Sequence, residues 1–475
     1  MKTHNVPTAA HDEAARSATP EVLRQATTSA PTKPFTLTAV GDLIYLRPML
    51  PTLRARVPQM LELLGGADVV YGNLETNVFD LGSADEPEEI VPEAASGGTW
   101  MHASSAIAPE LVAFGFNVLA GANNHAGDWG RGGMRSTIRH MARHELSLAG
   151  VGDTLAQATL PKYTDLAFGR VGHVSATTTY TPHSRAADPS GVAPARAGVN
   201  AIHLTPVTSL TPAAFADMEN LCAKVGAMAG RVIEPGSEVE WQGSRYVAGD
   251  TDRLGLSYRI DEDHLRRNLT AIRQARQNSN FVIFSVHSHE PYNESQEPSD
   301  ALVEIARRAV GAGAGLVLCH GPHQLRGIEI FEGVPIVYSL GNFFMMNNSL
   351  DIVPPDFSKE ISERYSIDNI GRLTVPEQFA TRNRNLFAKP EMLESAIFRF
   401  SFSEGGRLKD IRAYPIELGL NHTGADIGVP APASSHVAER ILLRLRDLSK
   451  EFGTEFTIQT DEAWPHAAHI ADTNR

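Results

Sequence analysis

The feature that most constrains this chain is a regular alternation of buried-strand and amphipathic-helix patterns. Apolar strand-like runs cover residues 34–41, 67–72 and 116–121, and helix-like periodicity covers 51–64 and 106–114 between them. Parallel strands need crossover connections that are usually helices, so this order predicts a mostly parallel sheet covered by helices. The C-terminal ends of such strands meet at one edge of the sheet, where polar residues can form a site.

The alternation continues through the rest of the chain. Further helices are predicted at 134–144, 262–276, 300–310 and 435–452, and further strands or hairpins at 163–178, 280–287, 314–320, 327–343 and 396–418. The Glu332-Gly333 and Gly405-Gly406 pairs are typical of hairpin turns. We therefore predict an α/β fold that ends in a C-terminal hairpin and helix.

Three segments depart from this pattern. Residues 1–33 are rich in Ala, Thr, Ser and Pro without apolar periodicity, which predicts a disordered tail. Residues 211–256 hold a helix and a short polar hairpin and are predicted to be an insertion. Residues 346–390 are polar and longer than an ordinary connection, which indicates an irregular lid or loop. The predicted catalytic unit is then 34–345, completed by 391–475.

Composition excludes several classes of protein. The 475 residues carry a formal charge of −13, which repels a nucleic-acid backbone or an anionic membrane surface. Cys222 and Cys319 are too few for a disulfide framework or a thiolate zinc module, so a metal must bind through oxygen and nitrogen. The N-terminus lacks an apolar signal region, and no stretch reaches the roughly 18 apolar residues of a membrane span. We expect a cytoplasmic protein with no nucleic-acid partner and no membrane span.

Five predicted strands end in side chains that can bind a metal ion or transfer a proton. These strand ends are Asp42, Glu75, Asn123–Asp128, His287–Glu290 and His320–His323. A single polar residue after a strand is usually a turn former or a helix cap. Five at one sheet edge predict a shared cluster instead.

Two spacings within this set indicate chemistry. His125 and Asp128 are three residues apart at a predicted helix start, so the carboxylate can orient the imidazole as an acid–base pair. His287 and His289 alternate at strand period and point the same way if the strand continues through both. Both imidazoles can then serve one site only if that face of the strand end lies against the site.

Five segments together carry a family resemblance: AVGDLIYLRPM, YGNLETNVFD, GANNHAGDWG, SRAADPSGVAPARAGVN and GPHQLRGIEIFEGVPIVYSLGNF. As a set they resemble the bacterial capsule-synthesis CapA family, which is named for poly-γ-glutamate synthesis. That family resembles the calcineurin-like metallophosphoesterases. The resemblance implies a two-sheet β-sandwich flanked by helices, with a metal site at the strand ends.

Residue by residue, the resemblance implies roles for the strand-end side chains. The family's motifs match Asp42, Glu75, Asn124, His125, His287, His320 and His323. Together with the spacings above, this predicts metal ligands at Asp42, Glu75, Asn124, His287 and His320, and acid–base residues at His125, Asp128, His289 and His323. A metallophosphoesterase has a histidine two residues after its first aspartate, where this chain has Ile44. One divalent metal is therefore expected, and a second is left open.

The predicted ligands Asp42, Glu75 and Asn124 are oxygen donors, which favours Mg, Mn or Ca over Zn or Fe. Arg131, Arg185 and Arg326 are candidates to bind an anionic substrate.

Several reactions use the same residues. The resemblance favours amide-bond chemistry on a peptide-like or poly-γ-glutamyl substrate, with a metal polarising the carbonyl and an imidazole protonating the leaving amine. Paired imidazoles also fit epimerisation at a peptide Cα. A phosphoesterase and a non-catalytic factor for capsule polymer assembly remain alternatives, and the oligomeric state is left open.

Overall fold

A computed structural model describes residues 29–83, 86, 89–228, 237–249, 253–387, 389–419, 426–459, 464 and 466–471. Residues 1–28 of the predicted tail lie outside this set. The last part of that tail is ordered against the body, because the Thr32 amide donates to the Phe168 carbonyl at 2.9 Å and Asn280 Nδ2 donates to the Ser29 carbonyl at 2.8 Å. The prediction of disorder is therefore wrong for residues 29–33.

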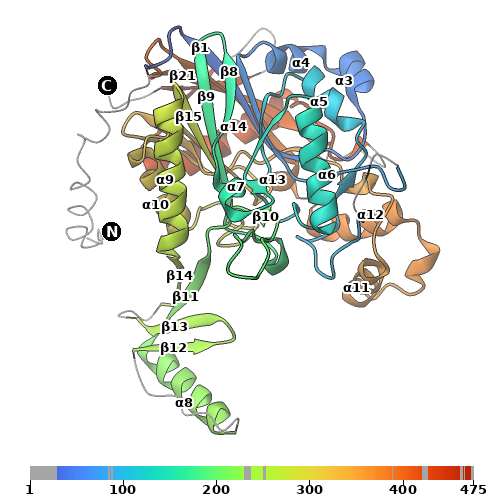
Figure 1. Ribbon diagram of the computed structural model, residues 1–475, viewed down its shortest axis with the longest axis vertical. Helices are drawn as coiled ribbons and strands as arrows, with labels where there is room; N and C mark the ends of the chain where they lie inside the picture. Colours follow the sequence, from blue (N-terminus) through green and yellow to red (C-terminus); the bar gives the residue numbers. More distant parts are fainter. Residues whose placement is uncertain are drawn as a thin grey trace.

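Two β-sheets stacked face to face form the centre of the molecule (Figure 1). The larger sheet has the order β23-β24-β21-β20-β1-β2-β5-β6, with β19 on β1 and β22 on β21. Its strands are β23 (Glu455–Gln459), β24 (Ala467–Ala471), β21 (Leu408–Glu417), β20 (Glu394–Phe402), β1 (Phe35–Ile44), β2 (Val69–Leu74), β5 (Val118–Ala120), β6 (Ser147–Ala149), β19 (Asn342–Met345) and β22 (Ala431–Pro432).

The second sheet has the order β17-β18-β16-β15-β9-β8. Its strands are β17 (Ile328–Phe331), β18 (Val334–Val337), β16 (Leu316–His320), β15 (Phe281–His287), β9 (Gly169–Thr177) and β8 (Lys162–Leu166). Two short pairs lie outside both sheets, β3 (Asn77–Val78) with β4 (His102–Ala103) and β7 (Val151–Gly152) with β10 (Gly198–Val199).

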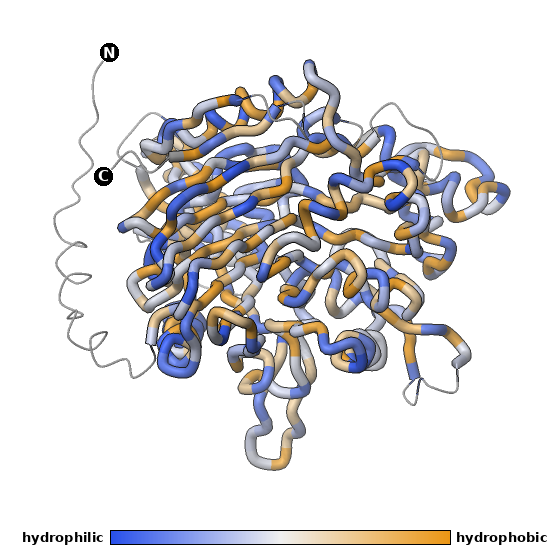
Figure 2. The backbone as a smooth tube through the Cα atoms, turned by 90° about the horizontal axis from the view of Figure 1, so that it is seen from above, coloured by the Kyte–Doolittle hydropathy of each residue, from blue (hydrophilic) through white to orange (hydrophobic). Residues whose placement is uncertain are grey.

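Apolar side chains from both sheets form the central core, which includes Phe35, Tyr71, Phe281 and Leu316. Seen from above, the strands lie in stacked rows across the middle of the molecule (Figure 2). Helices cover the two outer faces, and each has a core of its own. The predicted two-sheet α/β sandwich flanked by helices is confirmed.

The helices of this body fall into three groups. Over the larger sheet lie α3 (Leu50–Arg56), α4 (Pro58–Gly65), α5 (Ile107–Ala113) and α6 (Gly130–Arg143); over the second sheet lie α9 (Glu262–Asn278) and α10 (Asp300–Gly311). The others are α7 (Leu155–Thr159), α13 (Pro390–Leu393) and α14 (Ser435–Ser449), with 3-10 turns η1 (Pro182–Ser184), η2 (Asn347–Ser349), η3 (Ile370–Arg372) and η5 (Lys450–Phe452).

The single helix predicted at 51–64 is two helices, α3 and α4. Pro58 has no amide hydrogen and disfavours helical geometry in the residue before it. Val57 accordingly has φ −141° and ψ 53° and separates the two helices. The amphipathic pattern continues across this break, which explains why the periodicity alone predicted one helix.

The predicted insertion at 211–256 is an arm that projects from the body (Figure 1). It contains the expected helix, α8 (Pro212–Met228), and the expected hairpin, β12 (Glu238–Trp241) and β13 (Ser244–Ala248). β11 (Leu204–Leu210) and β14 (Gly255–Ile260) complete a four-stranded sheet. A small core around Phe215, Cys222 and Val239 holds the arm together.

The predicted irregular segment 346–390 is largely helical. It contains α11 (Pro355–Tyr365) and α12 (Val375–Leu386), which contact each other and are drawn in orange at the lower right of Figure 1. A capping box begins α12: the Thr374 side chain accepts the Glu377 amide, and the Glu377 side chain accepts the Thr374 amide. We call residues 346–390 the lid segment, and the expectation that it is irregular is wrong.

The sheet register places the strand ends together. Within the larger sheet, Asp42 pairs with Asn73 on one side and with Asn342 on the other. In the second sheet, His287 pairs with His320. The parallel strands of both sheets therefore end at a common edge, as the strand order predicts.

Gly41 allows β1 to approach the backbone of Gly341. A Cβ at position 41 would lie 1.8 Å from the Gly341 carbonyl oxygen, which also accepts the Asp42 amide at 3.0 Å. Gly41→Ala is expected to lower the free energy of unfolding by about 1–3 kcal/mol, because the backbone at Gly341 must move to make room for the methyl group. Urea denaturation measures this, with Gly65→Ala as the control, since nothing lies within 4 Å of a Cβ there. Equal stability of the two variants would contradict the steric argument.

No helix within the described ranges is both long enough and apolar enough to cross a bilayer.

Candidate active site

The first set of possible metal ligands consists of Asp42, His287 and His320, which we call group A. One ligand atom from each lies within 4.8 Å of the others, and all three side chains are fully buried. Nδ1 of His287 lies 2.9 Å from Nδ1 of His320, which lies 3.8 Å from Oδ1 of Asp42. Three predicted metal ligands thus lie together.

The second set consists of Glu75, His289 and His323, which we call group B. Their ligand atoms also lie within 4.8 Å of one another. Group B adjoins group A, because Nε2 of His289 lies 2.9 Å from Nε2 of His287 and Nδ1 of His323 lies 3.5 Å from Oδ2 of Asp42. His289 follows the end of β15 and is half-buried, and its side chain still meets the site.

Asn73 lies between the two groups and was not predicted from the sequence. Its Nδ2 donates to Oδ1 of Asp42 at 2.8 Å and to Oε2 of Glu75 at 3.3 Å. Asn123 determines which side-chain atom of Asn73 is the amide nitrogen. Oδ1 of Asn123 accepts the His125 amide, and Nδ2 of Asn123 donates to the Leu74 carbonyl. The Asn73 atom that faces Nδ2 of Asn123 must therefore be the acceptor Oδ1. Asn73 therefore contributes hydrogen-bond donors between two carboxylates.

Burial and neighbouring charges set the protonation of the two carboxylates. Burial, followed by the charge of Asp42, raises the pKa of Glu75 well above its usual value. Burial alone would raise the pKa of Asp42 as well, but contacts with His323, His320 and Asn73 lower it overall. Asp42 is thus the carboxylate that these surroundings keep ionised.

Their surroundings keep three of the imidazoles, those of His287, His289 and His320, neutral. Burial, followed by the neighbouring histidines, lowers the pKa of His287 well below its usual value. Burial lowers the pKa of His289 to about 3 and that of His320 to about 4. A neutral imidazole is the form that binds a metal ion.

These residues fit a divalent metal. Oδ2 of Asp42 and Oε1 of Glu75 are buried and have no hydrogen-bond partner among the described residues. A buried polar atom without a partner lowers the stability of the fold, unless a bound ion or water molecule takes the place of that partner. Each group combines one carboxylate with two imidazoles, which favours Mn, Fe or Zn over Mg or Ca. The predicted preference for Mg, Mn or Ca over Zn or Fe stays a prediction, and the four imidazoles among the carboxylates count against its Mg and Ca part.

His125 and Asp128 form the predicted pair beside group B. Nδ1 of His125 lies 2.7 Å from Oδ2 of Asp128 and 3.1 Å from the Thr99 carbonyl oxygen. Since both are acceptors, Nδ1 carries the proton, and Nε2 lies 3.8 Å from Oε1 of Glu75 with its lone pair free. Burial raises the pKa of Asp128 although His125 and two backbone amides lower it.

The loop at residues 97–99 supports this pair. The Gly97 amide donates to Oδ1 of Asp128 at 2.8 Å, and its carbonyl accepts Nδ2 of Asn124 at 2.7 Å. Oδ1 of Asn124, the atom that a metal would use, is buried and has no partner among the residues the structure describes. The predicted ligand role of Asn124 stays a prediction.

Among the described residues, the three predicted substrate-binding arginines make no hydrogen bond to a side chain of group A or group B. Arg326 is fully buried, and its guanidinium donates to the carbonyls of Glu290, Tyr292 and Ser295 at 2.9–3.3 Å. It supports that loop, so the structure does not favour a substrate role. Arg131 and Arg185 are exposed, and within the described chain neither contacts group A or group B.

Tyr71 is a further buried partner of the site. Its hydroxyl lies 3.0 Å from Nε2 of His320, and burial raises the Tyr71 pKa far above its usual value. Its oxygen can accept the Nε2 proton, which leaves Nδ1 of His320 free to bind a metal. Tyr71 points into the space between the sheets from mid-strand, so it carries no strand-end signal.

Tyr71→Phe is expected to weaken metal binding about 10-fold, because outer partners of this kind orient ligand histidines. Competition of the purified protein against a chelator measures the change. Tyr163→Phe, on the outer strand β8, is the matched control. Unchanged affinity in Tyr71→Phe would remove this residue from the site.

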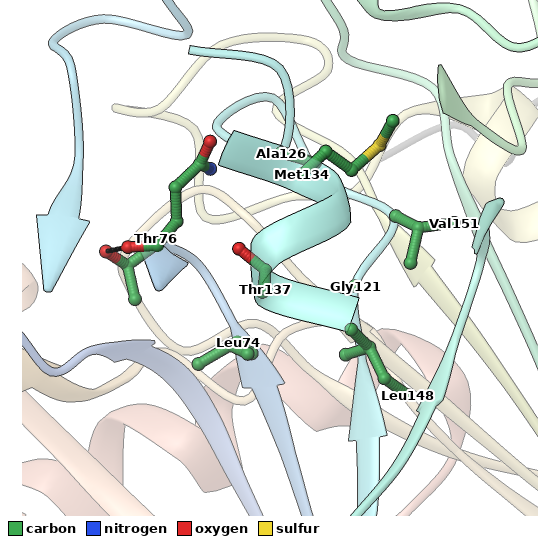
Figure 3. Close-up of a pocket in the computed structure, with 9 residues that line it drawn as sticks. Leu74, Thr76, Gly121, Ala126, Met134, Thr137, Leu148 and Val151 are labelled. Carbon is green, nitrogen blue, oxygen red and sulfur yellow. Dashed lines mark hydrogen bonds between the residues drawn. The ribbon is translucent and has the colours of Figure 1, made fainter. Parts of the chain in front are cut away.

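Two hollows elsewhere do not serve as the substrate pocket. A void of about 10 Å³ lies between α6 and the ends of β2 and β5, lined by Leu74, Thr76, Met134, Thr137 and Leu148 among others (Figure 3). It holds at most one water molecule. A shallow hollow of about 430 Å³ between β6 and β8 includes no residue of either group.

A protein family and several known proteins are similar to this chain. The family model described as bacterial capsule synthesis protein PGA_cap matches residues 36–347. Two uncharacterized proteins of Sinorhizobium fredii, y4sH and y4uA, are each 38% identical over 434 residues, covering 90% of this chain and 91% of their own length. The PGA biosynthesis protein CapA of Bacillus subtilis is 26% identical over 228 residues, covering 48% of this chain and 42% of that protein.

Solved structures resemble the chain only weakly. A phosphatase from Mycoplasma pneumoniae is 10% identical, with a TM-score of 0.37 over 81% of this chain and 94% of that one. A 5′-nucleotidase precursor from Thermus thermophilus is 10% identical, with a TM-score of 0.32 over 87% of this chain and 58% of that one.

Proposed function

The chain belongs to the family of bacterial capsule synthesis proteins PGA_cap, and from this premise we propose that it is a metal-dependent acid–base enzyme acting on amide bonds of a peptide-like or poly-γ-glutamyl substrate. The resemblance to CapA proteins inferred from the sequence is confirmed. The observation that carries the proposal is the His125–Asp128 pair, whose free Nε2 lies 3.8 Å from Glu75 and so adjoins the possible metal ligands.

A metal held by groups A and B would polarise the substrate carbonyl as a Lewis acid. His125 is placed to move a proton at its Nε2, because Asp128 holds the opposite nitrogen and stabilises the imidazolium that forms. In amide cleavage, a water molecule adds to the carbonyl carbon and gives a proton to Nε2, and this proton passes to the leaving nitrogen as the C–N bond breaks. Loop 97–99 keeps the pair in place, since its backbone contacts both residues.

The test uses a γ-glutamyl tetramer as the probe. The full chain, loaded in turn with Mn, Zn and Fe, is incubated with the tetramer, and products are followed by mass spectrometry. Shorter γ-glutamyl products that disappear with chelator and in His125→Ala are expected. If no tested metal supports cleavage of this peptide or of α-linked glutamyl peptides, amide-bond chemistry is ruled out for these substrates.

Epimerisation at a peptide Cα is the second candidate, and one observation favours it. His125 and the half-buried His289 lie on separate elements and both adjoin Glu75. Two such bases could remove a Cα proton from one face and return one to the other.

Deuterated water distinguishes the two reactions. An epimerase adds about one dalton to the intact peptide, because the returning proton comes from an exchangeable imidazole. A hydrolase gives fragments without label at Cα. Labelled intact peptide would therefore replace the first proposal with the second.

A further inference from the structure

We propose that Arg382 of the lid segment binds a carboxylate of the substrate and so selects anionic peptides. This inference rests on the proposed function and names a specificity-determining residue for the same site. Arg382 lies on α12, in a segment whose predicted irregularity gave no reason to single it out.

One side of Arg382 adjoins group B. Its guanidinium lies over the ring of Phe387, with 5.3 Å between Cζ and the ring centroid. The Phe387 ring in turn packs edge-on against His323, with 5.7 Å between centroids. The lid segment therefore brings an arginine and an aromatic ring to a histidine of the site.

The other side of Arg382 adjoins the acid–base pair. Nη2 donates to the Gly98 carbonyl oxygen at 2.9 Å. The residues before and after Gly98 hold the pair, since the Gly97 amide donates to Asp128 and the Thr99 carbonyl oxygen faces Nδ1 of His125. Arg382 is thus tied to the same short loop that positions His125.

The charge of Arg382 is incompletely satisfied. Nη1 is buried and has no hydrogen-bond partner among the described residues, and the charge of Glu360, a carboxylate that acts on the guanidinium, is opposed by that of Arg364. Arg326, by contrast, donates to three backbone carbonyls. Glu360 makes no hydrogen bond to this guanidinium among the described residues, and a buried Nη1 without an acceptor is costly, so the unpaired edge of Arg382 favours an anion from outside the chain.

The chemistry of this edge favours a carboxylate. A planar guanidinium stacked on a ring pairs best with a planar, two-oxygen anion. Oγ1 of Thr99, next to the Gly98 contact, is also buried and has no partner among the described residues, so a hydroxyl is available for a neighbouring amide. A substrate with a carboxylate close to its amide bond, as in a γ-glutamyl unit, presents both groups.

The experiment compares two probes, a γ-glutamyl trimer with free α-carboxylates and the same trimer with α-carboxamides. Binding to the full, metal-loaded chain is measured by calorimetry for wild type, Arg382→Gln and Arg382→Lys. Arg384→Gln is the matched control, because Arg384 is exposed on the same helix. Wild type and the control are expected to prefer the carboxylate probe by about 10- to 100-fold. Arg382→Gln should lose that preference, and Arg382→Lys should keep part of it.

The outcomes separate this inference from the function on which it rests. A carboxylate preference that survives unchanged in both Arg382 variants, or is absent in wild type, overturns the role of Arg382 and leaves amide chemistry standing. Binding of neither probe by wild type overturns both. If Arg382→Gln loses both probes because the lid fails to fold, the lysine variant decides: a preference smaller than that of wild type supports the inference, and a preference equal to that of wild type overturns it.

Discussion

Replacing His125 with alanine is expected to lower turnover by about 100- to 10,000-fold while the bound metal stays unchanged. This range is typical of removing a general acid or base. The expectation follows from the geometry: Nδ1 of His125 is held by Asp128 and Thr99, and Nε2 lies 3.8 Å from Glu75, whereas the groups that could hold metal contain other histidines.

Turnover is followed on whichever glutamyl peptide shows metal-dependent chemistry, and metal content is read by elemental analysis. His436→Ala, at an exposed position on α14, is the control. Asp128→Asn should cost less, because the imidazole remains although its tautomer is no longer fixed. Loss of metal from His125→Ala in proportion to activity would instead make His125 a ligand.

The edge where the site forms was predictable because strand order determines it. Asp42, Glu75, His287 and His320 each follow an apolar run in a parallel strand, and the register brings such ends together whatever the loops do. The His125–Asp128 pair was predictable for a local reason, since its geometry depends on a spacing of three residues.

The residues that were missed depend on tertiary contacts. Tyr71 lies mid-strand, and only the packing of one sheet on the other brings it to His320. Asn73 precedes Glu75 by two residues and so shares its face of the strand, a signal that was present in the sequence and not used.

The lid was missed for a different reason. Its helices α11 and α12 are short and amphipathic, and the polar composition of the segment obscured their helical periodicity in the sequence. Arg382 reaches the site from more than 250 residues beyond His125, through contacts with Gly98 and Phe387 that no local pattern encodes.

Glu75→Gln is expected to have opposite effects on the metal-free and metal-loaded protein. Without metal, Glu75 and Asp42 are two buried carboxylates close to one another, separated by the donors of Asn73. Burial and the charge of Asp42 drive Glu75 towards its protonated form, which costs free energy at neutral pH, and glutamine is neutral without that cost, so the metal-free variant should be as stable as wild type or more stable, by about 1–2 kcal/mol.

With metal, the same change removes a charged ligand from group B, so the variant should bind less metal and gain less stability from it. Elemental analysis and thermal unfolding with and without added Mn or Zn measure both effects. Glu297→Gln, on the surface, is the control for loss of one negative charge. Because a purely structural carboxylate would destabilise the metal-free protein when replaced and leave the metal content unchanged, that pair of results would place Glu75 outside the metal site. The expected pair, a metal-free protein that is no less stable and a metal content that falls, arises only if the buried carboxylate is kept for a cation.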